Sequence, residues 1–247
     1  MSANVNELMP LWKHVVELRR HLLISAVALV LASIPAYVFR DYVMAFALAQ
    51  GQISSLAFIH PVEPFTSYLR LAVSVGFLAI LPFIMLQVWR FLIPGLTARE
   101  KKTVASASVF GATLFYAGCA FGFFVVSRVA LAFLLGVASP DLQAQITVGN
   151  YISFVTSLTL LLGLSFQLPL VIVVLVKLGL LSIQTLRARR RHMIVGLWIL
   201  AAMLTPPDVV SQALLAGPLM LLYELSIVLA RLAERRRPTH IGTGNAA

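Results

Sequence analysis

Acidic and aromatic side chains stand among basic residues in two polar stretches of an otherwise apolar chain. Glu17 precedes a pair of arginines, and Glu100 lies within the run Arg99–Lys102, nine residues after Phe91. A carboxylate binds a guanidinium group through two parallel, charge-assisted hydrogen bonds, and an aromatic ring adds apolar or cation–π contact. This combination indicates a receptor for an arginine-bearing ligand. The alternative is that the neighbouring bases only neutralise each acid.

The residue types give little support for metal binding, disulfide formation or catalysis. The five histidines show no metal-ligand spacing, and Cys119 is the single cysteine, so neither a zinc motif nor a disulfide is possible. No nucleophile elbow, metalloprotease motif or phosphate loop is present. We therefore expect no catalytic residue, metal or cofactor, and no enzyme activity.

Two further polar features interrupt the apolar segments. Gln167 lies deep in one of them, two residues before Pro169, and a second is broken by Thr205, Pro206, Pro207 and Asp208. Two successive prolines end a helix and favour a turn. An intramembrane polar residue is costly and is by default a candidate functional site.

The amino-acid composition is typical of a membrane protein. The chain has 247 residues, of which 60% are hydrophobic and 11% charged, and its mean hydropathy is +0.93. A soluble domain has about 25% charged residues. These values exclude an ordinary soluble enzyme and a disordered protein.

The sequence predicts an all-α polytopic membrane protein whose residues 1–232 form one domain of six spans, followed by a disordered tail at 233–247. A span needs about 20 apolar residues. We expect the spans at 22–39, 71–90, 103–128, 150–176, 192–205 and 209–229. The last two are short, so they either thin the bilayer and cross it or re-enter without crossing.

The charge distribution predicts the orientation. With a cytoplasmic amino terminus, 16 of the 19 Lys and Arg residues lie on the cytoplasmic side, and Arg40, Arg70 and Arg128 remain outside. Basic residues collect on that side of membrane proteins, so both termini are expected in the cytoplasm. The net charge of +10 then reports topology and does not indicate a nucleic-acid partner.

The segments outside the membrane also have expected structure. Between the first two spans lie about 30 apolar residues containing Gly51, Pro61 and Pro64, which predict short helices on the outer face. The residues after Arg128 are expected either to extend the third helix beyond the membrane or to pack against the outer layer.

Several motifs in order make the chain resemble the TatC family, the polytopic receptor subunits of twin-arginine protein translocases. The resemblance covers about residues 10–232. The motifs are HVVELRRHL at 14–22, EPF at 63–65, LPFIMLQVWRFLIPGL at 81–96 with Glu100 after it, FGFFVVSRVALAFLL at 121–135, LSFQLP at 164–169 and MLTPPDVVSQALLAGPLMLLYE at 203–224.

The resemblance implies a function. The chain would sit in the cytoplasmic membrane of a prokaryote and bind twin-arginine signal peptides of folded precursors. The proton-motive force would drive the transport of these precursors across the membrane. It would assemble with TatA-type and TatB-type single-span partners and with further copies of itself. The recognition surface would comprise Glu17, Leu18, Arg19, Phe91 and Glu100.

The family commonly has a glutamate where this chain has Gln167. An amide avoids the cost of burying a charge, about 2.5–3.5 kcal/mol on insertion scales, and still donates and accepts hydrogen bonds. Whether it keeps the partner-contact role of the glutamate is open. The resemblance also places the turn 205–208 where the family meets its single-span partners. The competing class is a secondary transporter of small solutes, which would take up substrate without any partner.

Overall fold

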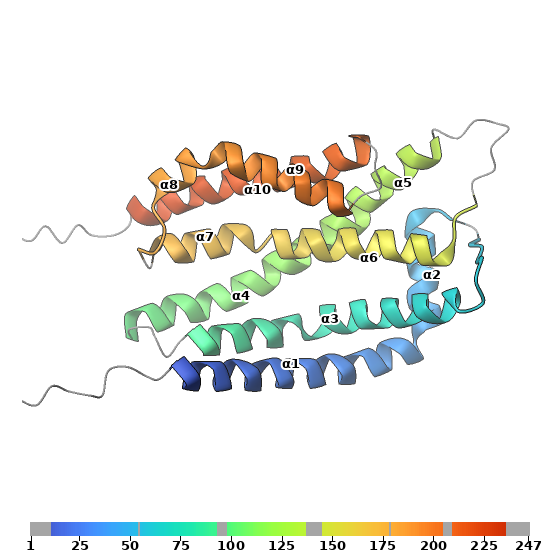
Figure 1. Ribbon diagram of the computed structural model, residues 1–247, viewed down its shortest axis with the longest axis horizontal. Helices are drawn as coiled ribbons and strands as arrows, with labels where there is room; N and C mark the ends of the chain where they lie inside the picture. Colours follow the sequence, from blue (N-terminus) through green and yellow to red (C-terminus); the bar gives the residue numbers. More distant parts are fainter. Residues whose placement is uncertain are drawn as a thin grey trace, which may run out of the picture. The chain divides into compact units, whose positions relative to one another are not determined.

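The computed structural model describes residues 11–53, 55–92, 98–136, 145–177, 179–204 and 209–235, and nearly all of them are helical. Within these ranges no strand forms, and Ala57 and Thr147 make an isolated parallel bridge. Figure 1 labels the helices, which are α1 (Leu11–Val38), α2 (Arg40–Gly51), α3 (Glu63–Leu92), α4 (Ala98–Phe121), η2 (Gly122–Val126), α5 (Ser127–Gly136), α6 (Val148–Ser165), α7 (Leu168–Lys177), α8 (Ile183–Ala188), α9 (Arg190–Leu204) and α10 (Val209–Arg235). The predicted all-α class is confirmed.

Five segments are long and apolar enough to cross a membrane. They are Leu18–Val38, Glu63–Val88, Phe110–Gly136, Val148–Lys177 and Val209–Leu232. Helix α9, at the expected fifth span, has 15 residues and reaches only about 22 Å, against a hydrocarbon core of about 30 Å. The number of crossings and the side of each terminus stay predictions, and the tail from 236 lies outside the described residues.

The chain divides into two compact units, Met1–Gly163 and Leu164–Ala247. Helices α1–α5 and all but the end of α6 belong to the first unit, and α7–α10 belong to the second. That residues 1–232 form a single domain stays a prediction.

In the first unit, α1 and α3 run side by side (Figure 1). Gly76 lies against Ser33, where an added Cβ would be 2.5 Å from the Ser33 hydroxyl oxygen and 2.9 Å from its backbone nitrogen. Small residues of this kind let two membrane helices approach closely.

A buried cluster in the first unit joins four helices near the end where α2 lies. Met44 and Ala47 of α2 pack with Leu71 of α3, Leu131 of α5 and Ile152 of α6. Helix α2 therefore covers the ends of the spans, as the apolar segment before Pro61 predicted. The third helical segment continues past Arg128, because η2 and α5 extend α4 to Gly136. That this part lies beyond the membrane stays a prediction.

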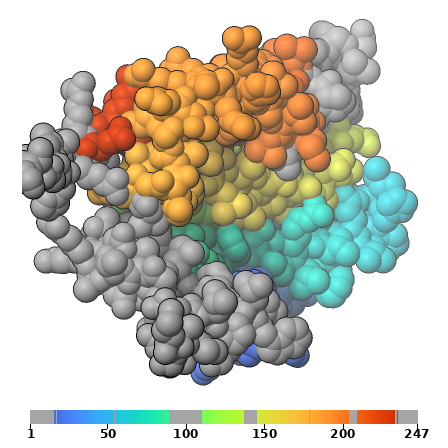
Figure 2. Space-filling view, turned by 60° about the vertical axis from the view of Figure 1, so that its left-hand side comes forward, coloured from blue at the N-terminus to red at the C-terminus, as the bar shows by residue number. Residues whose placement is uncertain are grey.

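The expected span 150–176 differs in one respect, because a turn at 166–167 divides it into α6 and α7. Pro169 has no N–H to donate to the carbonyl of Ser165, and its ring clashes with a continuing helix. In the second unit, α10 packs against α7, α8 and α9. Figure 2 shows α8 and α9, coloured orange, as one continuous surface next to α10 in red.

Candidate functional site: one end of the α1–α3 pair

A polar contact joins α1 to α3 near one end of this antiparallel pair. His21 Nδ1 lies 2.6 Å from Gln87 Oε1, and Gln87 is buried at 6% exposure. An amide oxygen only accepts, so the Nδ1–H of His21 donates. A buried amide without a partner is costly, and this bond therefore favours one register of the two helices.

The predicted binding residues lie just beyond this contact. Leu18 and Arg19 precede His21 by less than one turn, and Phe91 follows Gln87 by four residues, or about 6 Å along α3. Because the helices run in opposite directions, both segments extend past the contact toward the same end. Leu18 and Arg19 are exposed. The backbone places Glu17 and Phe91 within helices, and their side chains lie outside the described residues.

Glu100 belongs to the neighbouring helix, which begins at Ala98. Helices α3 and α4 pack together, and Figure 1 shows the start of α1, the end of α3 and the start of α4 at the same end of the first unit. A carboxylate in the first turn of a helix is stabilised by the helix dipole. The side chain of Glu100 is not among the described ones, so its contact with a ligand stays a prediction.

Gln167 occupies the turn between α6 and α7 and is buried at 8% exposure. Its backbone N–H donates to the carbonyl of Leu164 at 3.0 Å, and its own carbonyl accepts from Val171 at 2.9 Å. Gln167 therefore sits at a break between two helices, and its role as a partner contact stays a prediction. Residues Thr205, Pro206, Pro207 and Asp208 lie outside the described residues.

Glu63, in the EPF motif, holds together the other end of the first unit. Its two carboxylate oxygens accept from the backbone N–H of Ile59 at 3.0 Å and of Gly149 at 2.9 Å. The adjacent bridge adds bonds from Ala57 to Ile146 and from Val148 to Ala57. The EPF motif alone predicts no role for Glu63. In the structure its carboxylate links the loop before α3 to the start of α6, and we call this contact the Glu63 clasp.

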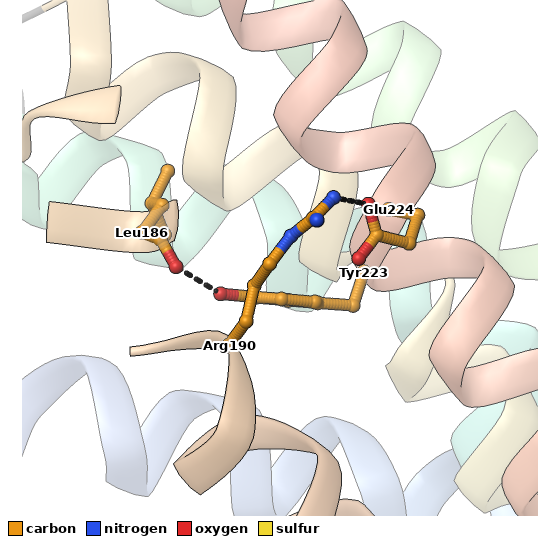
Figure 3. Close-up of polar contacts among 4 residues, drawn as sticks. All are labelled: Leu186, Arg190, Tyr223 and Glu224. Carbon is orange, nitrogen blue, oxygen red and sulfur yellow. Dashed lines mark hydrogen bonds and ion pairs between the residues drawn. The ribbon is translucent and has the colours of Figure 1, made fainter. Parts of the chain in front are cut away.

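A second polar cluster that the sequence did not reveal lies in the second unit (Figure 3). Arg190 at the start of α9 forms an ion pair with Glu224 of α10, and the hydroxyl of Tyr223 donates to the carbonyl of Leu186 at 2.8 Å. Both charged side chains are almost half exposed, whereas Tyr223 is buried. The cluster fixes α8 and α9 against α10. Helix spacing alone could not pair residues 34 positions apart.

Within the described ranges no group of three His, Cys, Asp or Glu side chains could hold a metal. The long apolar helices and the polar end of the α1–α3 pair define an α-helical polytopic membrane protein. A family model described as Sec-independent protein translocase protein (TatC) matches residues 13–218. The chain therefore belongs to the TatC family, and it is a component of the twin-arginine translocase.

Individual proteins agree with this assignment. The chain is 38% identical over 226 residues to the TatC protein of Carboxydothermus hydrogenoformans, covering 90% of this chain and 93% of that protein. It is 33% identical over 233 residues to the protein of Escherichia coli strain K12, covering 92% and 90%. A crystal structure described as the twin-arginine translocase receptor TatC matches with a TM-score of 0.81 at 36% identity. That match covers 90% of this chain and all of the other.

Proposed function

We propose that this chain is the signal-peptide receptor of its translocase. The paired arginines of a folded precursor bind at the face formed by the start of α1, the end of α3 and the start of α4. The observation that supports this placement most is the bond between His21 and Gln87. It holds the segments carrying Glu17 and Phe91 at the same end, beside the first turn of α4.

Each predicted residue has a distinct role in this proposal. Glu100 binds a signal-peptide guanidinium through paired hydrogen bonds, and Phe91 supplies the adjoining apolar surface. Leu18 and Arg19 are exposed at the same end. Arg19 pairs with an acid and orders the start of α1, because it would repel another arginine.

The apolar part of the signal then inserts along the helices, and single-span TatA-type and TatB-type partners complete the passage. Gln167 and the turn 205–208 are the proposed partner contacts. Helix α9, with 15 residues, thins the bilayer nearby. The proton-motive force drives transport across the cytoplasmic membrane, with both termini of this chain on the cytoplasmic side.

The experiment compares two peptides on the full chain in lipid nanodiscs. One carries the twin arginines of a signal peptide, and the other has lysines at both positions. The receptor proposal expects the arginine peptide to bind at least tenfold more tightly, because lysine cannot make the bidentate contact. Equal affinities would contradict it. Substrate-dependent uptake of a small solute by vesicles holding only this chain would favour the transporter class instead.

A further inference from the structure

The first unit contains an apolar cavity that the proposed signal-peptide face does not use. Its volume is about 300 Å³, and it lies between α2, α3, α4 with η2, and α6, with walls that include Ala47, Leu71, Val75, Ala120 and Val155. This volume is at the lower end of the range for ligand pockets, about 300–1,000 Å³.

Two of the hydroxyl groups that line this cavity are hydrogen-bonded to backbone carbonyls. The hydroxyl of Tyr116 donates to the carbonyl of Leu78 at 2.8 Å, and that of Thr156 donates to Ile152 at 2.5 Å. The space that remains suits a hydrocarbon chain better than a polar solute.

A polar crevice adjoins the cavity. Phe46 and Phe124 line both spaces, and the crevice adds Gln50, Gln52 and Arg128 in a volume of about 420 Å³. The two rings are 57% and 52% exposed, so they form an accessible rim between the spaces. An apolar pocket therefore continues into a site that carries a cation and two amides.

Arg128 is exposed beside this crevice, where its guanidinium group can bind an anion. It lies within the candidate span Phe110–Gly136. Among the described side chains, ion pairs join Arg40 to Asp41 and Arg190 to Glu224, and Arg128 takes part in neither. A charged residue in a span is costly unless its head reaches the lipid headgroups or an anion.

The side-chain oxygen of Gln50 lacks a hydrogen-bond donor within the described ranges. Its Nε2 donates to the carbonyl of Phe123 at 2.6 Å, but its buried Oε1 has no partner among the described residues. A ligand that carries both an anionic phosphate and hydroxyl groups satisfies Arg128 and Gln50 together. The headgroup of phosphatidylglycerol has this chemistry and a net negative charge. The headgroup of phosphatidylethanolamine carries the same phosphate, but its ammonium group cancels that charge and weakens the attraction to Arg128.

The dimensions agree with one acyl chain. Tyr116 in the cavity and Arg128 in the crevice are 12 residues apart, which is about 18 Å along a helix. One leaflet of the hydrocarbon core is about 15 Å thick. We propose that the cavity and the crevice together bind one phosphatidylglycerol molecule, with the phosphate on Arg128 and an acyl chain in the cavity.

The competing occupant is an apolar helix of another membrane protein. Thr159 favours that alternative, because its hydroxyl lines the cavity, is buried and has no partner in the described part of the chain. A helix with a polar side chain would bind it, whereas an acyl chain would not. The variant Thr159→Val therefore separates the two occupants.

The test uses the full chain in nanodiscs containing equal amounts of phosphatidylglycerol and phosphatidylethanolamine. After mild detergent extraction, native mass spectrometry counts the retained lipids. We expect one phosphatidylglycerol per chain, preferred at least fivefold over phosphatidylethanolamine. Arg128→Gln should abolish the preference, and Ala120→Phe should lower retention of both lipids at least fivefold by filling the cavity. Ala120 is exposed, and the smaller Ala120→Leu repeats the test if the Phe variant does not fold.

The matched controls are Arg70→Gln, an exposed arginine in the first turns of α3, and Thr159→Val, both of which should retain lipid as the parent chain does. Free glycerol phosphate should not displace the lipid. An unchanged preference for phosphatidylglycerol in Arg128→Gln, or unchanged retention in Ala120→Phe, would overturn the proposal. So would loss of retention in Thr159→Val, or displacement of the lipid by an equimolar peptide of an apolar single-span helix.

Discussion

His21 Nδ1 and Gln87 Oε1 lie 2.6 Å apart although 66 residues separate them in the chain. The contact joins α1 to α3 within about 6 Å, one helical turn, of the segments that carry Glu17 and Phe91. It is therefore the described feature that most directly connects the fold of the first unit to the proposed binding face.

Breaking this bond should weaken both stability and ligand binding. His21→Leu leaves the buried Gln87 without its partner, which should cost about 1 kcal/mol. The double variant His21→Leu, Gln87→Met should recover most of that loss, because replacing both partners by apolar groups is nearly neutral. Unfolding in mixed micelles measures the cycle, and additive losses would contradict a direct bond.

Gly76 should tolerate no side chain. An alanine there would meet the backbone nitrogen of Ser33 at 2.9 Å, and this atom cannot move without separating α1 from α3. We expect Gly76→Ala to destabilise the chain by about 1–3 kcal/mol, as overpacking does. The control is Gly217→Ala in α10, where nothing lies within 4 Å and a small gain in stability is expected. Equal melting temperatures for the two variants would argue against the close approach.

Glu63→Gln should weaken the contact between the loop before α3 and the start of α6. The amide keeps one acceptor oxygen, so one of the bonds from Ile59 and Gly149 is lost. Hydrogen exchange at the amides of Ala57 and Val148, which form the adjacent bridge, should become faster. Asp41→Asn is the control, since its ion pair with Arg40 is 3.8 Å long and exposed and is worth little. Unchanged exchange in Glu63→Gln would show that the bridge stands without the clasp.

In the second unit, Tyr223→Phe should cost more stability than Glu224→Gln. The phenol is buried and bonds to Leu186, so its loss leaves a carbonyl unpaired at a cost of about 1–3 kcal/mol. The ion pair of Glu224 is almost half exposed and is worth about 0–1 kcal/mol. Thermal unfolding of both variants gives the order, and the reverse order would mean that the ion pair is the stronger contact.

Uncharged runs predicted the helical class and the approximate positions of the long helices, because a membrane span is set by composition over many residues. Individual ends were less predictable. Helix α3 begins at Glu63, eight residues before the expected start of the span. Pro64 is tolerated in the first turn of a helix, and the hydrogen bonds to Glu63 hold this turn in place. Pro169 indicated a possible break in the expected span 150–176. The long apolar run favoured one continuous helix instead, and the structure has a turn at 166–167.

Contacts between helices could not be predicted in the same way. His21 with Gln87 and Arg190 with Glu224 depend on the relative register of distant helices, which the pattern of one helix does not contain. The predicted site residues lie at one end of the first unit because successive spans run in opposite directions. The start of α1, the end of α3 and the start of α4 are therefore at the same end. The side-chain geometry of Glu17, Phe91 and Glu100 therefore needs a direct binding measurement.

The most direct measurement is the affinity of the full chain for a twin-arginine signal peptide before and after Glu100→Gln. The account predicts at least tenfold weaker binding, about 1.4 kcal/mol, because the amide cannot form the charge-assisted pair with guanidinium. Glu234→Gln, an exposed acid near the end of α10, should bind as the parent chain does. An unchanged affinity in Glu100→Gln would contradict the assignment of Glu100 as the arginine partner.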